Sequence, residues 1–225
     1  MKATILTGAV ALTTLAGAAQ ADLAGTFGFT DMGANWNSGS GILNVGAEEN
    51  GNLSSSGDLT NYTEVGAPLT ALFNSGFADG STSADSQFTM ELSNITGMSA
   101  DAVGTFMVTD INGDTLSGNY VGTWTNQFGF GFFDGEITLA SYNADTEAGN
   151  GMFEGNAGQA YAVPAGDMNG GLSMLLQMPE WFDSTTGDFQ ARTTQLDGIL
   201  VNTVPTPGSM ALMGLGGLMT ARRRR

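Results

Sequence analysis

Apolar and polar residues alternate along much of the chain, as they do in strands that bury one face in a core. The alternation is clearest in 26–29, 88–92, 120–124 and 128–132, and clusters of Asn, Asp, Ser and Gly separate such runs. The pattern predicts strands at 24–30, 41–46, 69–74, 86–93, 103–109, 116–125, 128–139, 158–163, 171–178 and 196–203. We find no amphipathic helix of useful length between them. We therefore expect an all-β fold, an antiparallel β-sandwich or jelly-roll-like single domain over 22–203.

The clearest hairpin is predicted between Phe106 and Trp124. Its turn contains Asn112-Gly113, a pair that favours the positive φ values of tight turns. Because the flanking residues alternate on both sides of this turn, we expect two neighbouring antiparallel strands.

The same turn holds the only metal candidate that we single out. Asp110, Asn112 and Asp114 alternate as the first ligands of an EF-hand loop do, but Thr115 and Val121 stand where that loop requires Gly and Glu. An EF-hand is therefore excluded. Two interpretations stay open: a looser calcium site formed by these three side chains, and a solvated turn, since Asp and Asn are also preferred turn residues.

Charge is distributed very unevenly. The chain has 22 acidic and six basic residues, and all the acids lie between Asp22 and Asp197, where Arg192 is the only base. The domain over 22–203 thus has a net charge of −21, which excludes binding to nucleic acid phosphates and disfavours anionic lipid heads. An acidic coat for solubility and a binder of divalent cations are the two interpretations. With no His and no Cys, the chain has no Ser-His-Asp triad, thiolate zinc site or cysteine nucleophile.

The first 21 residues have the three parts of a secretory signal peptide. Lys2 precedes an uncharged stretch over 3–16, and Ala19 and Ala21 supply the small-residue pattern that signal peptidase cleaves. We expect cleavage before Asp22 and export of the rest of the chain.

The last 22 residues predict a second targeting segment. Two prolines precede an apolar or small-residue stretch over 208–221, and four arginines end the chain. A helix of 14 residues would span about 21 Å against a hydrocarbon core of about 30 Å. We expect a short membrane anchor helix, a marginal transmembrane helix, with the arginines on the cytoplasmic side.

These terminal residues resemble the PEP-CTERM sorting signal of exosortase substrates, with Thr206 where the commonest motif has Glu. The resemblance covers only the tail and leaves the main domain unassigned. It implies processing near the Pro-x-Pro motif by an exosortase-like enzyme, transient inner-membrane anchoring, and a destination at the cell envelope or outside the cell. The predicted sorting and cleavage residues are Ala19, Ala21, Val204, Pro205, Thr206, Pro207, Gly208, Arg222, Arg223, Arg224 and Arg225.

Two other groups are candidates for carbohydrate chemistry. Asp134 and Glu136 are two residues apart on a predicted strand, a spacing that suits a glycosidase pair, but with 22 carboxylates such a pair is expected by chance, and a surface turn explains it more simply. Trp181, among aromatic and acidic residues, is a candidate glycan platform or a cap on the end of the fold, whereas Trp124 fits the core. Arg192 is expected to pair with a carboxylate such as that of Asp188 or Asp197.

The sequence therefore predicts an exported, non-catalytic protein of the cell surface or extracellular matrix, structural, adhesive or weakly glycan-binding. Signal peptidase, an exosortase-like enzyme and extracellular polysaccharide are the expected partners, and Ca²⁺ is the one candidate ion. The alternative is a secreted, carboxylate-dependent glycoside-acting enzyme.

Overall fold

The computed structural model describes residues 22–49, 54–63, 68–77, 85–144, 149–183, 185 and 187–203. Within these ranges the chain forms strands and no helix. The strands are β1 (Leu23–Thr30), β2 (Gly33–Asn37), β3 (Ile42–Gly46), β4 (Ser56–Asn61), β5 (Leu69–Phe73), β6 (Asp85–Ser93), β7 (Ser99–Thr109), β8 (Thr115–Gln127), β9 (Phe130–Asn143), β10 (Met152–Phe153), β11 (Tyr161–Ala162), β12 (Asp167–Gln177) and β13 (Phe189–Asn202).

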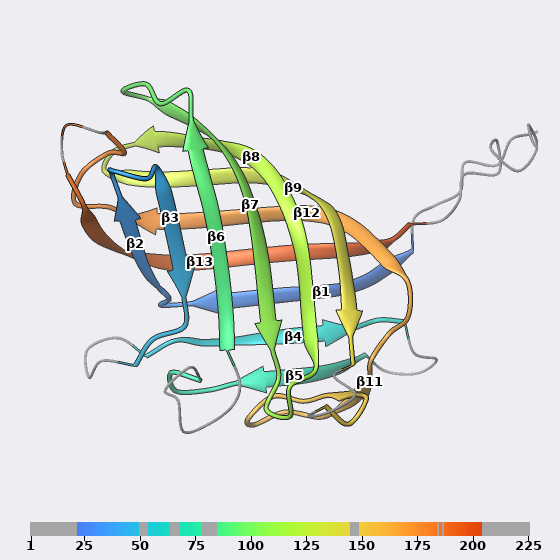
Figure 1. The fold of residues 1–225 in the computed structure, drawn as a ribbon. Coiled ribbons are helices and arrows are strands. Elements are labelled where there is room, and N and C mark those ends of the chain that lie inside the picture. The colour runs from blue at the N-terminus through green and yellow to red at the C-terminus, as the bar shows by residue number, and fades with distance from the viewer. Residues whose placement is uncertain are drawn as a thin grey trace, which may run out of the picture. The chain divides into compact units, whose positions relative to one another are not determined.

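Eight of these strands close into an antiparallel barrel. Their order is β12-β9-β8-β7-β6-β3-β2-β13, and β12 also pairs with β13 along 168–177 and 192–202, which closes the ring. The predicted sandwich or jelly roll is therefore wrong, because both leave sheet edges that this pairing removes. In Figure 1 the long strands β6 and β7 cross steeply in front of β12, β13 and β1.

The predicted anchor helix also needs correction. The segment expected to form it, 208–221, lies outside the described residues. In the ranges that the structure describes, no helix is long and apolar enough to cross a membrane.

Three strands branch from the ring at β13. On one edge β13 pairs with β2 through 189–192 and with β1 through 196–201. The strands β1 and β2 are thus two halves of one bent strand. Before the bend β1 pairs with β4, and β4 with β5, whereas after the bend β2 pairs with β3.

The bend lies at Asp31 and Met32, between the two halves. Asp31 adopts a φ of 59°, in the left-handed region that Asp tolerates better than bulky residues do. Thr193, fully buried on β13, holds Met32 from both sides: its Oγ1 accepts a hydrogen bond from Met32 N at 3.0 Å, and its N donates to Met32 O at 2.9 Å. The Asp31 carboxylate forms an ion pair with Arg192, the neighbour of Thr193.

Ser55 fills the fork where β4 and β3 separate. Its Oγ donates to Asp31 O at 2.9 Å and accepts from Glu48 N at 2.8 Å. Its backbone N donates to Glu48 O and its O accepts from Gly76 N. One buried serine therefore satisfies backbone groups that lose their ladder partners where the strands diverge.

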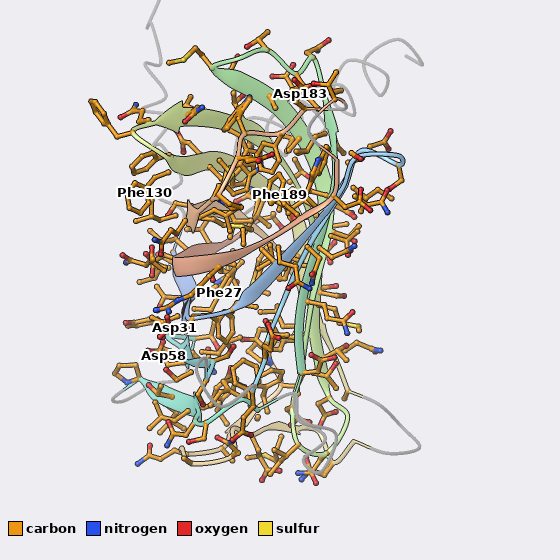
Figure 2. All side chains as sticks on the ribbon, turned by 90° about the vertical axis from the view of Figure 1, so that its left-hand side faces the viewer. Phe27, Asp31, Asp58, Phe130, Asp183 and Phe189 are labelled. Carbon is orange, nitrogen blue, oxygen red and sulfur yellow. The ribbon has the colours of Figure 1, made fainter. Side chains whose placement is uncertain are left out.

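Aromatic rings fill the core, and four of them lie across from a glycine on the next strand. Phe27 pairs with Gly198, Phe29 with Gly57, Phe106 with Gly118, and Tyr120 with Gly104. A Cβ on Gly104 or Gly118 would lie 2.6 Å from the facing ring. Inward glycines make room for rings that a barrel of eight strands could not otherwise hold. Figure 2 shows Phe27 among these side chains.

Replacing one such glycine should therefore destabilise the domain. A Cβ on Gly122 would lie 2.5 Å from the Phe133 ring and 2.5 Å from Asp134 O, so Gly122→Ala is expected to lower the free energy of unfolding by about 1–3 kcal/mol. Gly171→Ala on β12 is the control, because its nearest neighbour would be 3.9 Å away. Urea denaturation measures both. Equal unfolding midpoints for the two variants would contradict this account of the core.

Candidate functional site

The three metal candidates lie in the β7–β8 turn, where Asp110 and Asp114 are fully buried. Asp110 Oδ1 accepts hydrogen bonds from Asn112 N at 2.8 Å and Asp114 N at 2.9 Å, and its Oδ2 accepts from Glu154 N at 3.0 Å. Burial raises the pKa of Asp110, and the three backbone N–H groups oppose that rise. This carboxylate thus holds the turn closed and attaches it to the segment after β10.

Asp114 extends the same arrangement to the segment before β10. Its Oδ2 accepts from Asn150 N and Gly151 N, both at 3.1 Å. Asn112 donates through its side chain to Glu154, which also accepts from Asn150 Nδ2 at 3.2 Å. Five backbone donors therefore converge on two carboxylates. This geometry favours the turn interpretation, and the calcium site stays a prediction.

No group of three or more His, Cys, Asp or Glu side chains is placed to hold a metal ion within the described ranges. The predicted glycosidase pair, Asp134 and Glu136, is exposed on the outer face of β9. Asp134 lies in register with Thr123 on one side and Ser173 on the other. The pair thus lies on an open sheet surface.

A second carboxylate pair is brought together by strand register alone. Asp58 on β4 and Asp197 on β13 both lie opposite Gly28 of β1, and the two line a hollow on the outer face of these strands. Burial, and secondarily the charge of Asp197, raise the pKa of Asp58. Asp58 and Asp31 lie on the same side of the barrel (Figure 2). Because 139 residues separate the pair in the sequence, only the pairing of β4, β1 and β13 reveals it.

The tryptophans and Arg192 are largely structural. Trp124 is fully buried, as expected, and its Nε1 lies 3.1 Å from Met90 Sδ. Trp181 is half-buried, packs on Phe182, and donates from Nε1 to Thr96 O. Of the two interpretations, these contacts favour a cap on the end of the barrel over a glycan platform.

Arg192 pairs with a carboxylate as predicted, but the partner is Asp31 rather than Asp188 or Asp197. Asp188 instead accepts from Ser38 N and Oγ, and Asp197 accepts from Gln195 Nε2. The bend in the β1–β2 strand places Asp31 beside Arg192, and the sequence gives no sign of that bend.

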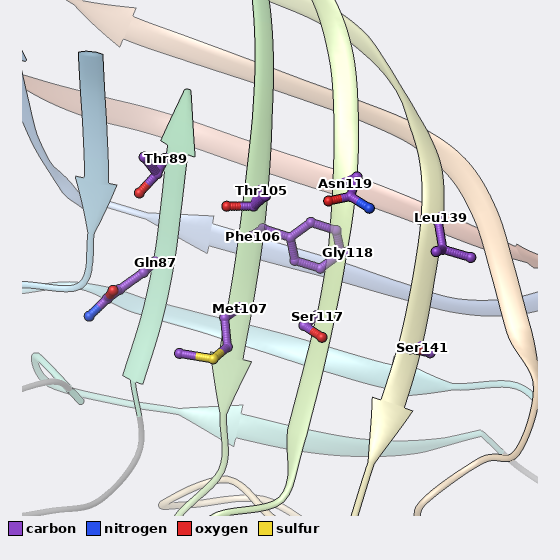
Figure 3. Close-up of a pocket in the computed structure, with 10 residues that line it drawn as sticks. All are labelled: Gln87, Thr89, Thr105, Phe106, Met107, Ser117, Gly118, Asn119, Leu139 and Ser141. Carbon is purple, nitrogen blue, oxygen red and sulfur yellow. The ribbon is translucent and has the colours of Figure 1, made fainter. Parts of the chain in front are cut away.

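The best candidate for binding is a shallow groove on the outer wall, across β6, β7, β8 and β9 (Figure 3). It has a volume of about 420 Å³. Its two sides are rows of side chains in cross-strand register, and its floor is the backbone between them at Phe106 and Gly118. The rows are Thr89, Thr105, Asn119 and Leu139 on one side and Gln87, Met107, Ser117 and Ser141 on the other.

Polar but uncharged side chains dominate this groove. Thr105, Ser117, Asn119 and Ser141 make no side-chain hydrogen bond within the part of the chain that the structure describes. Thr89 donates to Asn44 at 2.9 Å, and Gln87 donates to Asp85 at 2.7 Å. Met107 and Leu139, each about two-fifths exposed, add apolar surface. The groove thus offers hydroxyl and amide groups and small apolar patches to a ligand.

Comparison of the chain with protein-family models, curated proteins and solved structures finds no match. The sorting residues Ala19 and Ala21, the motif at 204–208 and the arginines at 222–225 lie outside the described residues. The groove and the sequence at both termini are therefore the features that bear on function.

The turn interpretation can be tested by one substitution. The Asp110 carboxylate accepts three backbone hydrogen bonds, two at one oxygen and one at the other. In Asp110→Asn one of these oxygens becomes an N–H₂ group, which cannot accept, and the other loses its charge. The free energy of unfolding should therefore fall by about 1–3 kcal/mol. Asp134→Asn, on the exposed face of β9, is the control and should leave stability unchanged or slightly raised, because it removes one charge from an acidic surface.

The effect of Ca²⁺ on the melting temperature distinguishes the two interpretations of the turn. At constant high NaCl, millimolar Ca²⁺ should leave the melting temperature of the unsubstituted protein unchanged if the carboxylates serve the turn alone. A rise that Asp110→Asn abolishes would instead establish a calcium site, because an ion bound only by the folded state stabilises it.

Proposed function

We propose that the chain is an exported, non-catalytic protein of the cell surface or extracellular matrix whose barrel binds a neutral polysaccharide in the groove across β6–β9. The observation that carries the proposal is the uncharged groove on an otherwise acidic domain. None of its ten lining residues is charged, whereas the region 22–203 has a net charge of −21.

The polar groups of the groove suit a chain of sugar hydroxyls. The side chains of Thr105, Ser117 and Asn119 are free to donate and accept, and β-sheet pairing fixes their spacing before any ligand arrives. Binding therefore orders few protein groups, which lowers its entropic cost. Met107 and Leu139 supply apolar contact for the C–H faces of sugar rings.

The shape of the groove suits an extended polymer. It crosses four strands, about 14 Å at the usual strand spacing, and it is open along the outer wall. An open, shallow site buries little surface, so each contact is weak. Adhesion to a polymer that presents many identical segments can still be strong through multivalency.

Charge determines which polysaccharides are accepted. The acidic surface around the groove makes the local electrostatic potential more negative. This repels uronate-bearing or sulfated polymers at low salt. A neutral polymer meets no such repulsion. Export and sorting through the two terminal segments, with processing by signal peptidase and an exosortase-like enzyme, would place the barrel where such polymers occur.

A secreted glycoside-acting enzyme remains the second candidate, and Asp58 and Asp197 are the pair that favours it. Two carboxyl groups that share a hollow, one with a raised pKa, are what such an enzyme uses as general acid and as base or nucleophile. Release of reducing sugar that Asp58→Asn abolishes would support the enzyme. Binding without turnover supports the adhesive protein.

The groove is tested by removing its free polar groups. The double variant Ser117→Ala/Asn119→Ala should bind neutral polysaccharide about tenfold more weakly, because each lost hydrogen bond contributes about 0.5–1.5 kcal/mol. Affinity electrophoresis of the full chain in gels containing dextran, mixed-linkage β-glucan or galactomannan measures this, with alginate as the acidic polymer.

Thr123→Ala is the matched control, since Thr123 is exposed on the same face of β8 but outside the groove. It should migrate as the unsubstituted protein does. Retardation by alginate but by none of the neutral polymers, or equal retardation of both variants, would contradict the proposed site.

A further inference from the structure

The β8–β9 hairpin ends in an unusual residue. Gln127 pairs with Phe130, so Phe128 and Gly129 form a two-residue loop. Both have positive φ, 55° and 84°, as a type I′ turn requires. The Phe128 side chain is fully exposed.

Stability does not explain a phenylalanine at this place. A bulky residue with positive φ is strained, and Asn is the preferred first residue of such a turn. A fully exposed ring gains nothing from burial, and Phe128 makes no ring contact within the part of the chain that the structure describes. Local strain at an exposed position therefore points to a contact made outside the chain.

A second exposed apolar residue lies at the neighbouring turn. Met98, between β6 and β7, is 66% exposed, and its O accepts a hydrogen bond from Asn126 N at 2.9 Å. Trp181 holds the same turn through its bond to Thr96 O. Phe130 and Phe132 on β9 add partly exposed rings nearby. We refer to Met98, Phe128, Phe130 and Phe132 as the apolar tip.

The stretches of chain that form the apolar tip carry no charged residue. No charged residue occurs from Leu92 to Ala100 or from Thr115 to Phe133. In the segment that contains Trp181, the acids Glu180 and Asp183 lie on either side of the Trp181–Phe182 pair. An acidic domain thus carries two adjacent hairpin ends that are uncharged and apolar.

We propose that the apolar tip inserts into the interface of a zwitterionic lipid surface, with Phe128 as its leading side chain. A ring that stacks on a sugar uses one face and rests its other face on the protein, whereas both faces of the Phe128 ring are exposed and insertion removes both from water. Met98 protrudes from a separate hairpin, and a fluid lipid interface accepts two protruding points without a matching pocket.

Charge favours zwitterionic over anionic lipid. The hairpin ends around Phe128 carry no charge, whereas the domain with its net charge of −21 repels anionic heads. Two or three apolar side chains bind weakly and reversibly. The proposal is independent of the groove, which lies near the opposite end of β8.

Vesicle binding by residues 22–203, the compact unit without the two predicted targeting segments, tests the proposal, because the apolar segment 208–221 would itself partition into vesicles. Phe128→Asn should weaken partitioning onto phosphatidylcholine vesicles about tenfold or more, the effect expected for one buried phenyl group. The same substitution should raise the midpoint of thermal unfolding, because Asn suits the turn. Val103→Asn is the control, since Val103 is 60% exposed on the outer face of β7 but distant from the tip in register. It should leave vesicle binding unchanged.

Phe128→Trp supplies a direct readout of insertion. Its added tryptophan emission should shift to the blue on phosphatidylcholine vesicles and be quenched by brominated lipid, and adding phosphatidylglycerol should reduce both effects. Vesicle binding that is absent, or equal in the unsubstituted protein and Phe128→Asn, overturns the proposal. Loss of dextran retardation in Phe128→Asn without a change in vesicle binding would also overturn it and assign the tip to carbohydrate.

Discussion

The bend at Asp31 and Met32 is the constraint on which closure of the barrel depends, because it lets one strand have two different sets of neighbours. Before the bend the strand belongs with β4 and β5, and after it with β3 and β6. Hydrogen bonds from Thr193 and Ser55 satisfy the backbone there, and the Arg192–Asp31 ion pair places the only base of the acidic domain at the same point. Without those bonds, the fork would leave buried backbone groups without partners.

Closure in turn determines where a ligand can bind. The interior is filled by rings that lie over glycines, from Phe29 over Gly57 to Tyr120 over Gly104, and a filled interior leaves the outer wall and the ends for binding. On the wall, two rows of uncharged polar side chains border the groove across β6–β9. At one end, two uncharged hairpin turns present Phe128 and Met98. We propose sugar polymers as the ligand of the wall and a lipid interface as the partner of the tip.

Much of this fold could be predicted from alternation, but not its closure. Long alternating runs correctly predicted β1, β6, the β7–β8 hairpin and β9. They missed β4, whose buried residues are consecutive rather than alternate, and β2, a short strand rich in Gly and Asn. A sandwich and a barrel share the same alternation, so only the β12–β13 pairing distinguishes them. The turn at Asp110 was visible in the sequence. The groove and the Asp58–Asp197 pair were not, because both arise from strand register.

The most direct test of the central claim is a map of the bound surface. In amide NMR spectra of the full chain titrated with a soluble neutral oligosaccharide, such as a mixed-linkage β-glucan fragment, the account predicts shifts concentrated at Thr105, Ser117 and Asn119 and at the facing residues of β6 and β9. Amides of the buried β1–β13 pairs should not move. Shifts centred on Asp58 and Asp197, or no shifts at any concentration of the oligosaccharide, would contradict the assignment of the groove.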